Sequence, residues 1–336
     1  MPITFHPRLP FRNFALLAFT IAGCYSPTNS EPGAAANSPT KVTLLLNWNP
    51  EAEHGGYYAA LVHGFYREAG LDVAIQPGGK DTPVIQQVAS GRVMFGVVNA
   101  DNILYGRAQQ APIVALMAPL QTSPRCLIVH ESSGIREFSQ LKDMTLAMSN
   151  TQAFSFYLRK KVPLRGVDIV PYPGNVARFL TDTNYGQQGY MFSEPYIAKR
   201  NGGDPHVLML ADLGFNPYTS LLCTTESMTA DRTDLVEKMS AASVRGWQKY
   251  LADPAETNAY IHKLNPAMDL DVLEYGANAI KPLTESEAAK QSGFGAMALQ
   301  RWQTLIDQMV ECEQLAPDAV KANEAMLVPK KLLPRP

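Results

Sequence analysis

KVTLLLNWNPEAEHGGYYAA, residues 41–60, is the stretch of sequence that decides the fold. Its first six residues form a short apolar run that is typical of a buried β-strand. A helical pattern begins at Gly55, and the connection before it contains Trp48 and His54. Large aromatic side chains are costly to expose to water, and the adjacent Gly55 and Gly56 are costly to order. The combination indicates that this connection is more than an ordinary surface turn.

The alternation of short apolar strands and helices continues from this stretch to about residue 120. Short strands that alternate with helices predict a largely parallel sheet covered by helices on both faces. We expect Asp81 or Thr82 to cap the second helix, with Pro83 in its first turn. The expected helices span residues 55–70, 81–91 and 100–110, and the expected strands span residues 41–46, 71–79, 92–98 and 112–120.

The same pattern restarts in the second part of the chain, which predicts a second α/β lobe. Strands are expected at residues 144–149, 167–173, 188–193 and 206–210, with helices from about Gln152, Asn175 and Glu194. The run PYTSLLCTT, residues 217–225, is predicted to return to the first lobe, and the chain is nearly all helical from about Thr229. The predicted boundaries are 41–122 and 217–336 for lobe I, and 123–216 for lobe II.

The first 24 residues have the layout of an export signal. Arg8 and Arg12 precede an apolar run that is too short to span a bilayer, and small residues precede Cys24. The tetrad IAGC resembles a bacterial lipobox, in which the cysteine is lipidated; a plain signal peptide with an incidental cysteine is the alternative. We therefore expect a signal peptide at residues 1–23, a flexible tether rich in Ser, Pro and Ala at 24–40, and a membrane-anchored lipoprotein that faces the periplasm or the cell exterior.

Composition excludes several classes of function. The chain has 29 Lys and Arg against 31 Asp and Glu without a run of charge, so no nucleic-acid partner is expected. Cys126, Cys223 and Cys312 are widely spaced and form no CxxC pair, so neither a zinc site nor a disulfide framework is indicated. Buried free thiols are the preferred interpretation for Cys126 and Cys223, and a bridge between these two stays open. We expect no metal and no cofactor.

Ligands of open α/β sheets bind at the carboxyl ends of the strands, where helix N-termini present free N–H groups. Trp48 follows such a strand end and can stack on a flat ligand, although it could instead cover the core of its own lobe. His54 and Asn99 could equally be helix caps, and at most one of Tyr57 and Tyr58 is expected to face a cleft. The candidate ligand-binding residues are Asn47, Trp48, Asn49, His54, Gly55, Tyr57, Asn99, Gln121, Ser123, Asn150, Thr151, Tyr190 and Glu194.

Three segments together resemble one known family. Residues 44–79, residues 84–104 and GYMFSEPYIAKR at 189–200 are similar to the periplasmic binding proteins for nitrate, sulfonates and thiamine-precursor pyrimidines, and to the pyrimidine-binding branch in particular. The resemblance runs from about Lys41 to Thr225. It implies a type II periplasmic-binding-protein architecture: two lobes, each a mostly parallel sheet flanked by helices, joined by two crossover strands that close on a ligand. It also implies ABC permease subunits as partners.

Within that resemblance, Glu194 is the residue that selects the ligand class. The resemblance places a ligand-facing acid here, although a glutamate in the first turn of a helix is also commonplace. A carboxylate suits the amine and ring nitrogen of an aminopyrimidine and does not suit nitrate or a sulfonate, because two desolvated anions repel each other.

The expected function is therefore a lipid-anchored solute-binding component of an ABC importer. Its expected ligand is a hydroxymethyl- or formylaminomethyl-pyrimidine bound between the lobes. A sulfonate, taurine or a flavin precursor is the alternative within this class of protein. The family also includes enzymes that synthesise the pyrimidine from pyridoxal phosphate and a histidine of their own chain. Those enzymes carry a clustered cysteine motif that this sequence lacks, so an enzyme is not expected.

Overall fold

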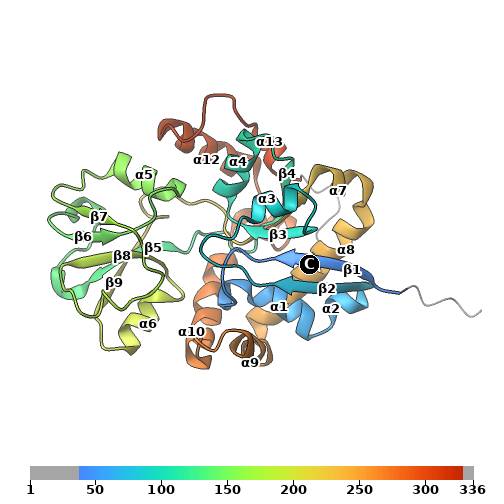
Figure 1. Ribbon diagram of the computed structural model, residues 1–336, viewed down its shortest axis with the longest axis horizontal. Coiled ribbons are helices and arrows are strands. Elements are labelled where there is room, and N and C mark those ends of the chain that lie inside the picture. Colours follow the sequence, from blue (N-terminus) through green and yellow to red (C-terminus); the bar gives the residue numbers. More distant parts are fainter. Residues whose placement is uncertain (1–37, 328–336) are drawn as a thin grey trace, which may run out of the picture. The chain divides into compact units, whose positions relative to one another are not determined.

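The computed structural model describes residues 38–327 (Figure 1). The predicted signal peptide, Cys24 and most of the predicted tether lie outside the described residues, as do residues 328–336. Within residues 38–327, none of the helices combines the length and the apolar character that a membrane span requires.

The first lobe is built on a five-stranded mixed sheet. Four of its strands run in the same direction, and β10 runs antiparallel to its neighbours β3 and β4. In spatial order the strands are β2 (Leu71–Gln76), β1 (Thr40–Leu45), β3 (Phe95–Val98), β10 (Leu221–Thr225) and β4 (Ile113–Met117).

The second lobe repeats this arrangement in another five-stranded sheet. Here β5 is the antiparallel strand, between β8 and β9. The strand order is β7 (Asp168–Val170), β6 (Thr145–Ala147), β8 (Tyr185–Tyr190), β5 (Arg125–His130) and β9 (Pro205–Met209). In each lobe the antiparallel strand is the one that arrives from the other lobe, so the predicted mostly parallel sheets joined by two crossovers are confirmed. The residues at which each lobe begins and ends stay a prediction.

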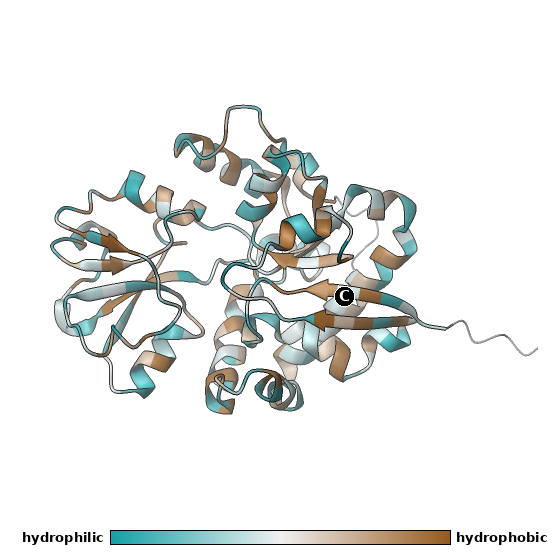
Figure 2. Ribbon diagram, viewed as in Figure 1, coloured by the Kyte–Doolittle hydropathy of each residue, from teal (hydrophilic) through white to brown (hydrophobic). Residues whose placement is uncertain are grey.

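Helices cover both faces of the first sheet (Figure 1). Strand β1 shows why its sequence is an unbroken apolar run. Val42 and Leu44 pack with α1 and α8 on one face, whereas Leu45 packs with α3 and α4 on the other. Figure 2 shows apolar residues on strands of both sheets, with β8 of the second lobe as a more hydrophilic strand. The helices of this lobe that precede the crossovers are η1 (Ala52–His54), α1 (Gly55–Val62), α2 (Phe65–Glu68), α3 (Val84–Ala89) and α4 (Ala100–Ala108).

The C-terminal part of the chain is helical, as expected, and packs mainly on the first lobe. Its elements are α7 (Glu226–Asp231), α8 (Thr233–Ala252), α9 (Ala255–Leu264), α10 (Leu270–Ile280), η4 (Lys281–Thr284), α11 (Glu287–Ser292), α12 (Leu299–Glu311) and α13 (Ala322–Ala325). The second lobe carries η2 (Glu131–Ser133), η3 (Phe138–Gln140), α5 (Ala153–Lys161) and α6 (Glu194–Arg200).

Three local predictions are wrong. The helix expected at residues 55–70 is interrupted at Gly64, whose φ of 76° is outside the helical range, so α1 and α2 are separate. The helix expected from Asn175 does not form, and turns occupy that segment. The N-cap of α3 is Pro83 instead of Asp81 or Thr82.

The adjacent glycines of the opening stretch serve helix packing. A Cβ atom at Gly55 would lie 2.1 Å from the ring of Tyr250, and one at Gly56 would lie 2.1 Å from the ring of Trp247. Both rings belong to α8, which therefore packs directly on the backbone of α1. The ring of Tyr57 meets that of Trp247 edge-on at 5.8 Å. The aromatic residues and the glycines occur together because two helices cross at very short range.

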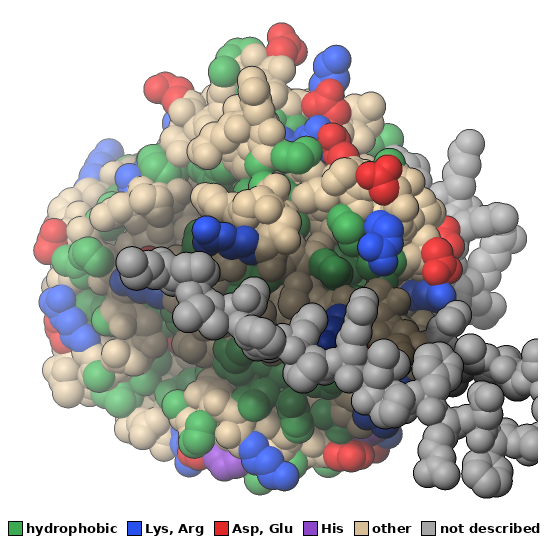
Figure 3. All heavy atoms as spheres, turned by 45° about the vertical axis from the view of Figure 1, so that its right-hand side comes forward, with side chains coloured by type: hydrophobic (Ala, Val, Ile, Leu, Met, Phe, Trp, Pro, Cys, Tyr) green, Lys and Arg blue, Asp and Glu red, His purple; other side chains and the backbone are tan. Residues whose placement is uncertain are grey.

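Cys126 and Cys223 are free thiols, as preferred from the sequence. Cys126 lies on β5 and Cys223 on β10, so the two belong to different sheets and form no bridge. Both are buried, and burial raises the pKa of Cys223 to about 12, which keeps its thiol protonated. On the face drawn in Figure 3, basic and acidic side chains are interspersed without a patch of one sign.

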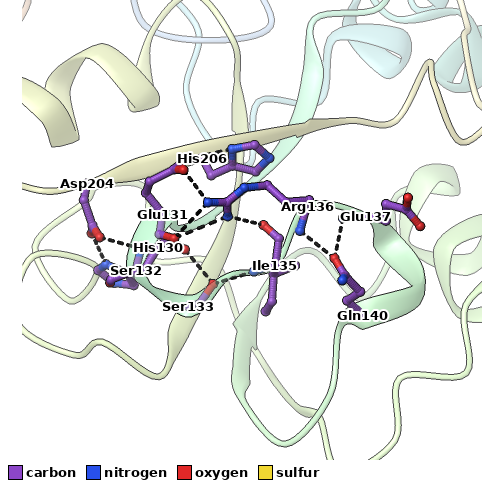
Figure 4. A network of polar contacts seen from close by, with 10 residues as sticks. All are labelled: His130, Glu131, Ser132, Ser133, Ile135, Arg136, Glu137, Gln140, Asp204 and His206. Atoms are coloured by element: carbon purple, nitrogen blue, oxygen red, sulfur yellow. Dashed lines mark hydrogen bonds and ion pairs between the residues drawn. The ribbon is translucent and has the colours of Figure 1, made fainter.

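A cluster of polar side chains lies at the end of β5 in the second lobe (Figure 4). The buried His130 contacts the carboxylate of Asp204 through Nδ1 at 2.5 Å and the backbone oxygen of Asp182 through Nε2 at 3.1 Å. Its ring stacks on Phe179 with the ring centres 4.0 Å apart. Hydrogen bonds from the side chain and the backbone N–H of Ser132, and then from His130, hold the pKa of Asp204 well below its usual range.

We expect Asp204→Asn to destabilise the protein by about 1 kcal/mol at neutral pH. This loss of stability is small for a hydrogen bond to a charged group, because the side chain of Asp204 is 42% exposed and solvent screens its charge. A lowered carboxyl pKa stabilises the folded state above the unfolded pKa of about 3.9, and this contribution is lost as the pH falls through the lower folded pKa. Urea unfolding of both proteins should therefore show a difference at neutral pH that shrinks in acid. A difference that is independent of pH would rule out the charge as its source.

Candidate functional site: a cavity between the lobes

A cavity of about 550 Å³ lies between the two lobes. Strand ends and helix N-termini of both lobes line it. From the first lobe it is lined by Asn47, Trp48, Glu51, Glu53, residues 80–86, Val98, Asn99, Asn102, Tyr105, Gly106 and Gln109. From the second lobe it is lined by Arg125, residues 148–152, Pro171, Tyr172, Gln188, Tyr190 and Glu194.

A chain of hydrogen bonds fixes the segment after β1 that lines one side of the cavity. His54 is buried, and burial lowers its pKa, so the ring is neutral and its Nε2 faces the side-chain oxygen of Asn47 at 2.9 Å. The amide nitrogen of Asn47 then donates to Glu53 Oε1 at 3.0 Å. The hydroxyl of Ser220, on the second crossover, donates to the same oxygen at 2.7 Å. The buried carboxylate of Glu53 is thus satisfied within the protein.

The opposite wall is organised by Glu194. The hydroxyl of Tyr172 donates to one of its carboxylate oxygens and the backbone N–H of Tyr190 to the other, both at 2.7 Å. The guanidinium of Arg125 lies over the ring of Tyr190 at 4.2 Å, and its Nη2 donates to the Tyr190 hydroxyl at 3.2 Å. Asn99, from the first lobe, donates to the same hydroxyl at 3.1 Å. Tyr190 therefore links the two lobes inside the cavity.

Ion pairs join the lobes outside the cavity as well. Arg200 on α6 contacts Asp269 at 2.7 Å and Asp271 at 2.9 Å, at the start of α10. Lys161 at the end of α5 contacts Glu311 at the end of α12 at 2.7 Å. These side chains are partly exposed, so solvent screens the pairs and they add little to stability.

The structure brings about half of the sequence-predicted site residues to the cavity. Asn47, Trp48, Asn99, Asn150, Thr151, Tyr190 and Glu194 line it, and ligand contact by these residues stays a prediction. Asn49, His54, Gly55, Tyr57, Gln121 and Ser123 are not among the lining residues.

Four of the residues outside the lining follow the Trp48 strand end. Asn49 is exposed beside the cavity. His54, Gly55 and Tyr57 are buried in the first lobe, and the Tyr57 hydroxyl donates to the backbone oxygen of Ser220 at 2.8 Å. Tyr58 is buried as well, so neither tyrosine faces the cleft. The strand-end rule placed the start of the connection correctly, but the close crossing of α1 and α8 takes its later residues into the core.

Gln121 and Ser123 lie at the crossovers and are not among the lining residues. The crossovers pair with each other through an antiparallel bridge between Leu120 and Thr219. Next to this bridge, the side-chain nitrogen of Gln121 donates to the backbone oxygens of Ala118 at 2.8 Å and Ala296 at 3.0 Å. The backbone N–H of Ser123 donates to the side chain of Asn216 on the second crossover at 2.8 Å. The hydroxyl of Ser286 donates to the side-chain oxygen of Gln121 at 2.6 Å, so both polar atoms of this side chain are engaged within the protein.

Sequence reasoning missed Glu51, Glu53, Arg125 and Tyr172. Glu51 and Glu53 lie inside the opening stretch, between Trp48 and the Gly55–Gly56 pair. Acids in such a position were the signal that could have indicated them as site residues. Arg125 opens the strand that follows the first crossover, a position that carries a signal only once the crossover is placed. Tyr172 follows the short strand β7 and gave no signal of its own. Residues 38–327 contain no group of three or more His, Cys, Asp or Glu residues that could hold a metal ion.

A family model described as NMT1/THI5 like matches residues 51–257, more than half of the chain. The chain belongs to the NMT1/THI5-like family. The expected family is thereby confirmed.

Curated relatives in this family differ in what they do. The chain is 25% identical over 309 residues to the riboflavin-binding protein RibY of Chloroflexus aurantiacus, covering 85% of this chain and 88% of that protein. It is 20% identical over 297 residues to the formylaminopyrimidine-binding protein of Halalkalibacterium halodurans, with the same two coverages. It is 32% identical over 249 residues to the 4-amino-5-hydroxymethyl-2-methylpyrimidine phosphate synthase of Legionella pneumophila, covering 70% and 77%. Membership alone therefore does not decide between binding and synthesis.

The solved structures show the fold. The periplasmic aliphatic sulphonate binding protein SsuA from Escherichia coli superposes with a TM-score of 0.67 at 14% identity, covering 89% of this chain and 96% of that one. This NMT1/THI5-like protein therefore has the periplasmic-binding-protein fold expected from the sequence.

Proposed function

We propose that this protein is the solute-binding component of an ABC importer and that it binds an aminopyrimidine of the thiamine-precursor type. The observation that carries the proposal is the cavity between the lobes, whose lining combines aromatic side chains with carboxyl groups. Trp48, Tyr172 and Tyr190 provide flat apolar surface, and Glu51, Glu53 and Glu194 provide the acids. A cavity of about 550 Å³ is within the range of about 300–1,000 Å³ that is usual for small-molecule sites.

The charges of the lining favour a neutral or cationic ligand. Arg125 and Lys80 are the lining cations, and they face the three glutamates and Asp81. A sulfonate or nitrate would have to enter beside carboxylates in a desolvated site, which is costly. The fold is shared with a sulphonate-binding protein, but the chemistry of this lining does not suit a sulfonate.

We assign Glu194 a positioning role. Both of its carboxylate oxygens are engaged, by Tyr172 and by the backbone of Tyr190. It fixes the aromatic wall against which a ring would stack.

The positions of the histidines relative to the cavity favour a binding protein over a pyrimidine synthase. A synthase of the kind described above consumes a histidine of its own chain, and the lining residues of this cavity include none. His54, the histidine next to the site in sequence, is buried with its Nε2 bonded to Asn47.

A flavin is the second candidate ligand. The cavity is larger than a single pyrimidine ring needs, and it extends to Asn102 and Tyr105 on α4 and to Gln109 just after this helix. These side chains offer hydrogen bonds that hydroxyl groups of a longer ligand could use. A relative that aligns over 85% of this chain is named a riboflavin-binding protein.

The test is calorimetric titration of the purified protein with 4-amino-5-hydroxymethyl-2-methylpyrimidine, its formylaminomethyl analogue, riboflavin and taurine. Saturable one-to-one binding of a pyrimidine, with none of taurine, is the expected result. Binding of riboflavin alone would establish the second candidate. Binding of taurine alone, or turnover of pyridoxal phosphate, would refute the proposal.

We further propose that the protein is exported and anchored through a lipid on Cys24. The IAGC tetrad before the predicted tether supports this. Protein expressed in a bacterial host should partition into detergent, and Cys24→Ala should not. Equal partitioning of the two would exclude the anchor.

A further inference from the structure

Glu51 differs from the other two glutamates of the cavity in its hydrogen bonds. Glu53 accepts from Asn47 and Ser220, and Glu194 accepts from Tyr172 and Tyr190. Glu51 lines the cavity and is only 6% exposed, yet no comparable bond from a backbone or side-chain N–H reaches its carboxyl within residues 38–327. Its hydrogen-bond partner is the carboxyl of Glu53. A proton on Glu51 would form this bond, which leaves the carbonyl oxygen of Glu51 for a ligand.

The surroundings of Glu51 disfavour a negative charge. Burial, and then the carboxylates of Glu53 on η1 and Glu194 on α6, raise the pKa of Glu51 well above its usual range. Arg125 on β5 acts in the opposite direction and is outweighed. The other titratable groups close enough to interact with it electrostatically are the hydroxyls of Tyr172, after β7, and Tyr250 on α8, and neutral phenols add no positive charge. A proton on Glu51 removes the repulsion among the three acids.

We propose that Glu51 contacts the solute as a neutral carboxylic acid, using its O–H and its C=O together. This rests on the proposed function, because it assigns the residue that recognises the aminopyrimidine. The exocyclic amine of the ring would donate to the Glu51 carbonyl, and the neighbouring ring nitrogen would replace Glu53 as the acceptor of the Glu51 O–H. Glu53 would keep its bonds from Asn47 and Ser220. The two bonds lie side by side on one edge of the ring, so the contact discriminates against a ring that lacks the amine. It requires no charge on the ligand.

The contact makes binding dependent on pH in a defined direction. Deprotonation of Glu51 removes the O–H donor and sets a carboxylate against the lone pair of the ring nitrogen. Affinity for the neutral pyrimidine is therefore full below the pKa of Glu51 in the free protein. Above that pKa it falls, by up to about tenfold per pH unit, because one proton is taken up on binding.

The test compares three variants by calorimetry with 4-amino-5-hydroxymethyl-2-methylpyrimidine, from about pH 7 to about pH 9.5. Glu51→Gln keeps a donor and an acceptor at the same place without titrating, so it should bind within about threefold of the wild type at pH 7 and show no pH dependence. Glu51→Leu should bind roughly tenfold more weakly or worse. Glu194→Gln is the matched comparison: it should keep the pH dependence, but the fall in affinity should begin at a lower pH, because one of the carboxylates that raise the pKa of Glu51 is removed. Glu51→Gln binding as weakly as Glu51→Leu would overturn the proposal.

A second measurement needs no ligand. The infrared difference spectrum of wild type minus Glu51→Gln at neutral pH should contain the C=O stretching band of a protonated carboxyl group. Absence of the band would refute the neutral acid, whatever the protein binds. A band in a protein that binds no pyrimidine would instead refute the proposed function and with it the contact to the ring. Thermal unfolding of each variant shows whether a loss of binding is a loss of fold.

Discussion

Gly246→Ala is expected to lower the free energy of unfolding by about 3 kcal/mol. This is the largest loss of stability that we expect from a substitution that only adds a methyl group. Gly246 lies on α8 where this helix crosses α1. A Cβ atom there would lie 2.2 Å from the backbone oxygen of Gly56 and 2.6 Å from the Cβ of Ala60. Since the first of these is a backbone atom, no side-chain rotation relieves the clash and the two helices must separate. Urea unfolding monitored by circular dichroism measures the change.

Gly134→Ala is the matched control for this prediction. Gly134 has a φ of 72° and no atom within 4 Å of an added Cβ, so the substitution tests backbone strain without crowding. A left-handed conformation costs an alanine about 1–2 kcal/mol. Equal losses in the two variants would mean that the helix crossing is not the sensitive contact.

Trp48→Ala is expected to weaken pyrimidine binding by about 2 kcal/mol, or roughly thirtyfold, because it removes both the stacking surface and apolar area from the cavity. Trp48 lines the cavity just beyond β1, and its backbone oxygen accepts from the N–H of Gly78 at 3.0 Å. That backbone bond remains in the variant, so the loop should keep its position. Trp48→Phe keeps a smaller ring and should recover part of the affinity. Calorimetric titration provides the affinities.

The control for this second prediction is Asn49→Ala. Asn49 is the next residue in the chain, is exposed, and does not line the cavity. Its substitution should leave both affinity and stability unchanged. A loss of affinity at Asn49 as large as that at Trp48 would mean that the loop as a whole contacts the ligand. Unchanged affinity in Trp48→Ala would mean that Trp48 does not contact the ligand and instead covers the core of its own lobe.

If Glu51 is neutral, the cavity holds one acid that recognises the ligand and two that are structural. Glu53 ties the end of β1 to the second crossover through Ser220. Glu194 fixes Tyr172 and Tyr190 on the facing lobe. Ligand recognition and lobe orientation would then depend on the same small network. Variants of Glu53 are accordingly expected to affect stability before they affect specificity.

The sequence by itself determined the two lobes and the family, and it predicted the strand ends that line the cavity. These follow from local patterns. The apolar run at β1 is buried on both faces, and the helix starts at Asn99 and Glu194 are where the residue types predict them. Such patterns reflect burial and backbone geometry within one element, so they can be recognised without knowledge of the partners.

Only the tertiary structure decided which polar side chains remain available to a ligand. The family resemblance made Glu194 the expected ligand-facing acid, but Tyr172, 22 residues earlier, satisfies one of its oxygens. Glu51 gave no separate signal, because its burial depends on α8 and on the facing lobe. Hydrogen-bond satisfaction and the electrostatic cost of neighbouring charges depend on groups that are far apart in sequence. For that physical reason the strand ends that line the cavity could be predicted from the chain, and the hydrogen bonds within the cavity could not.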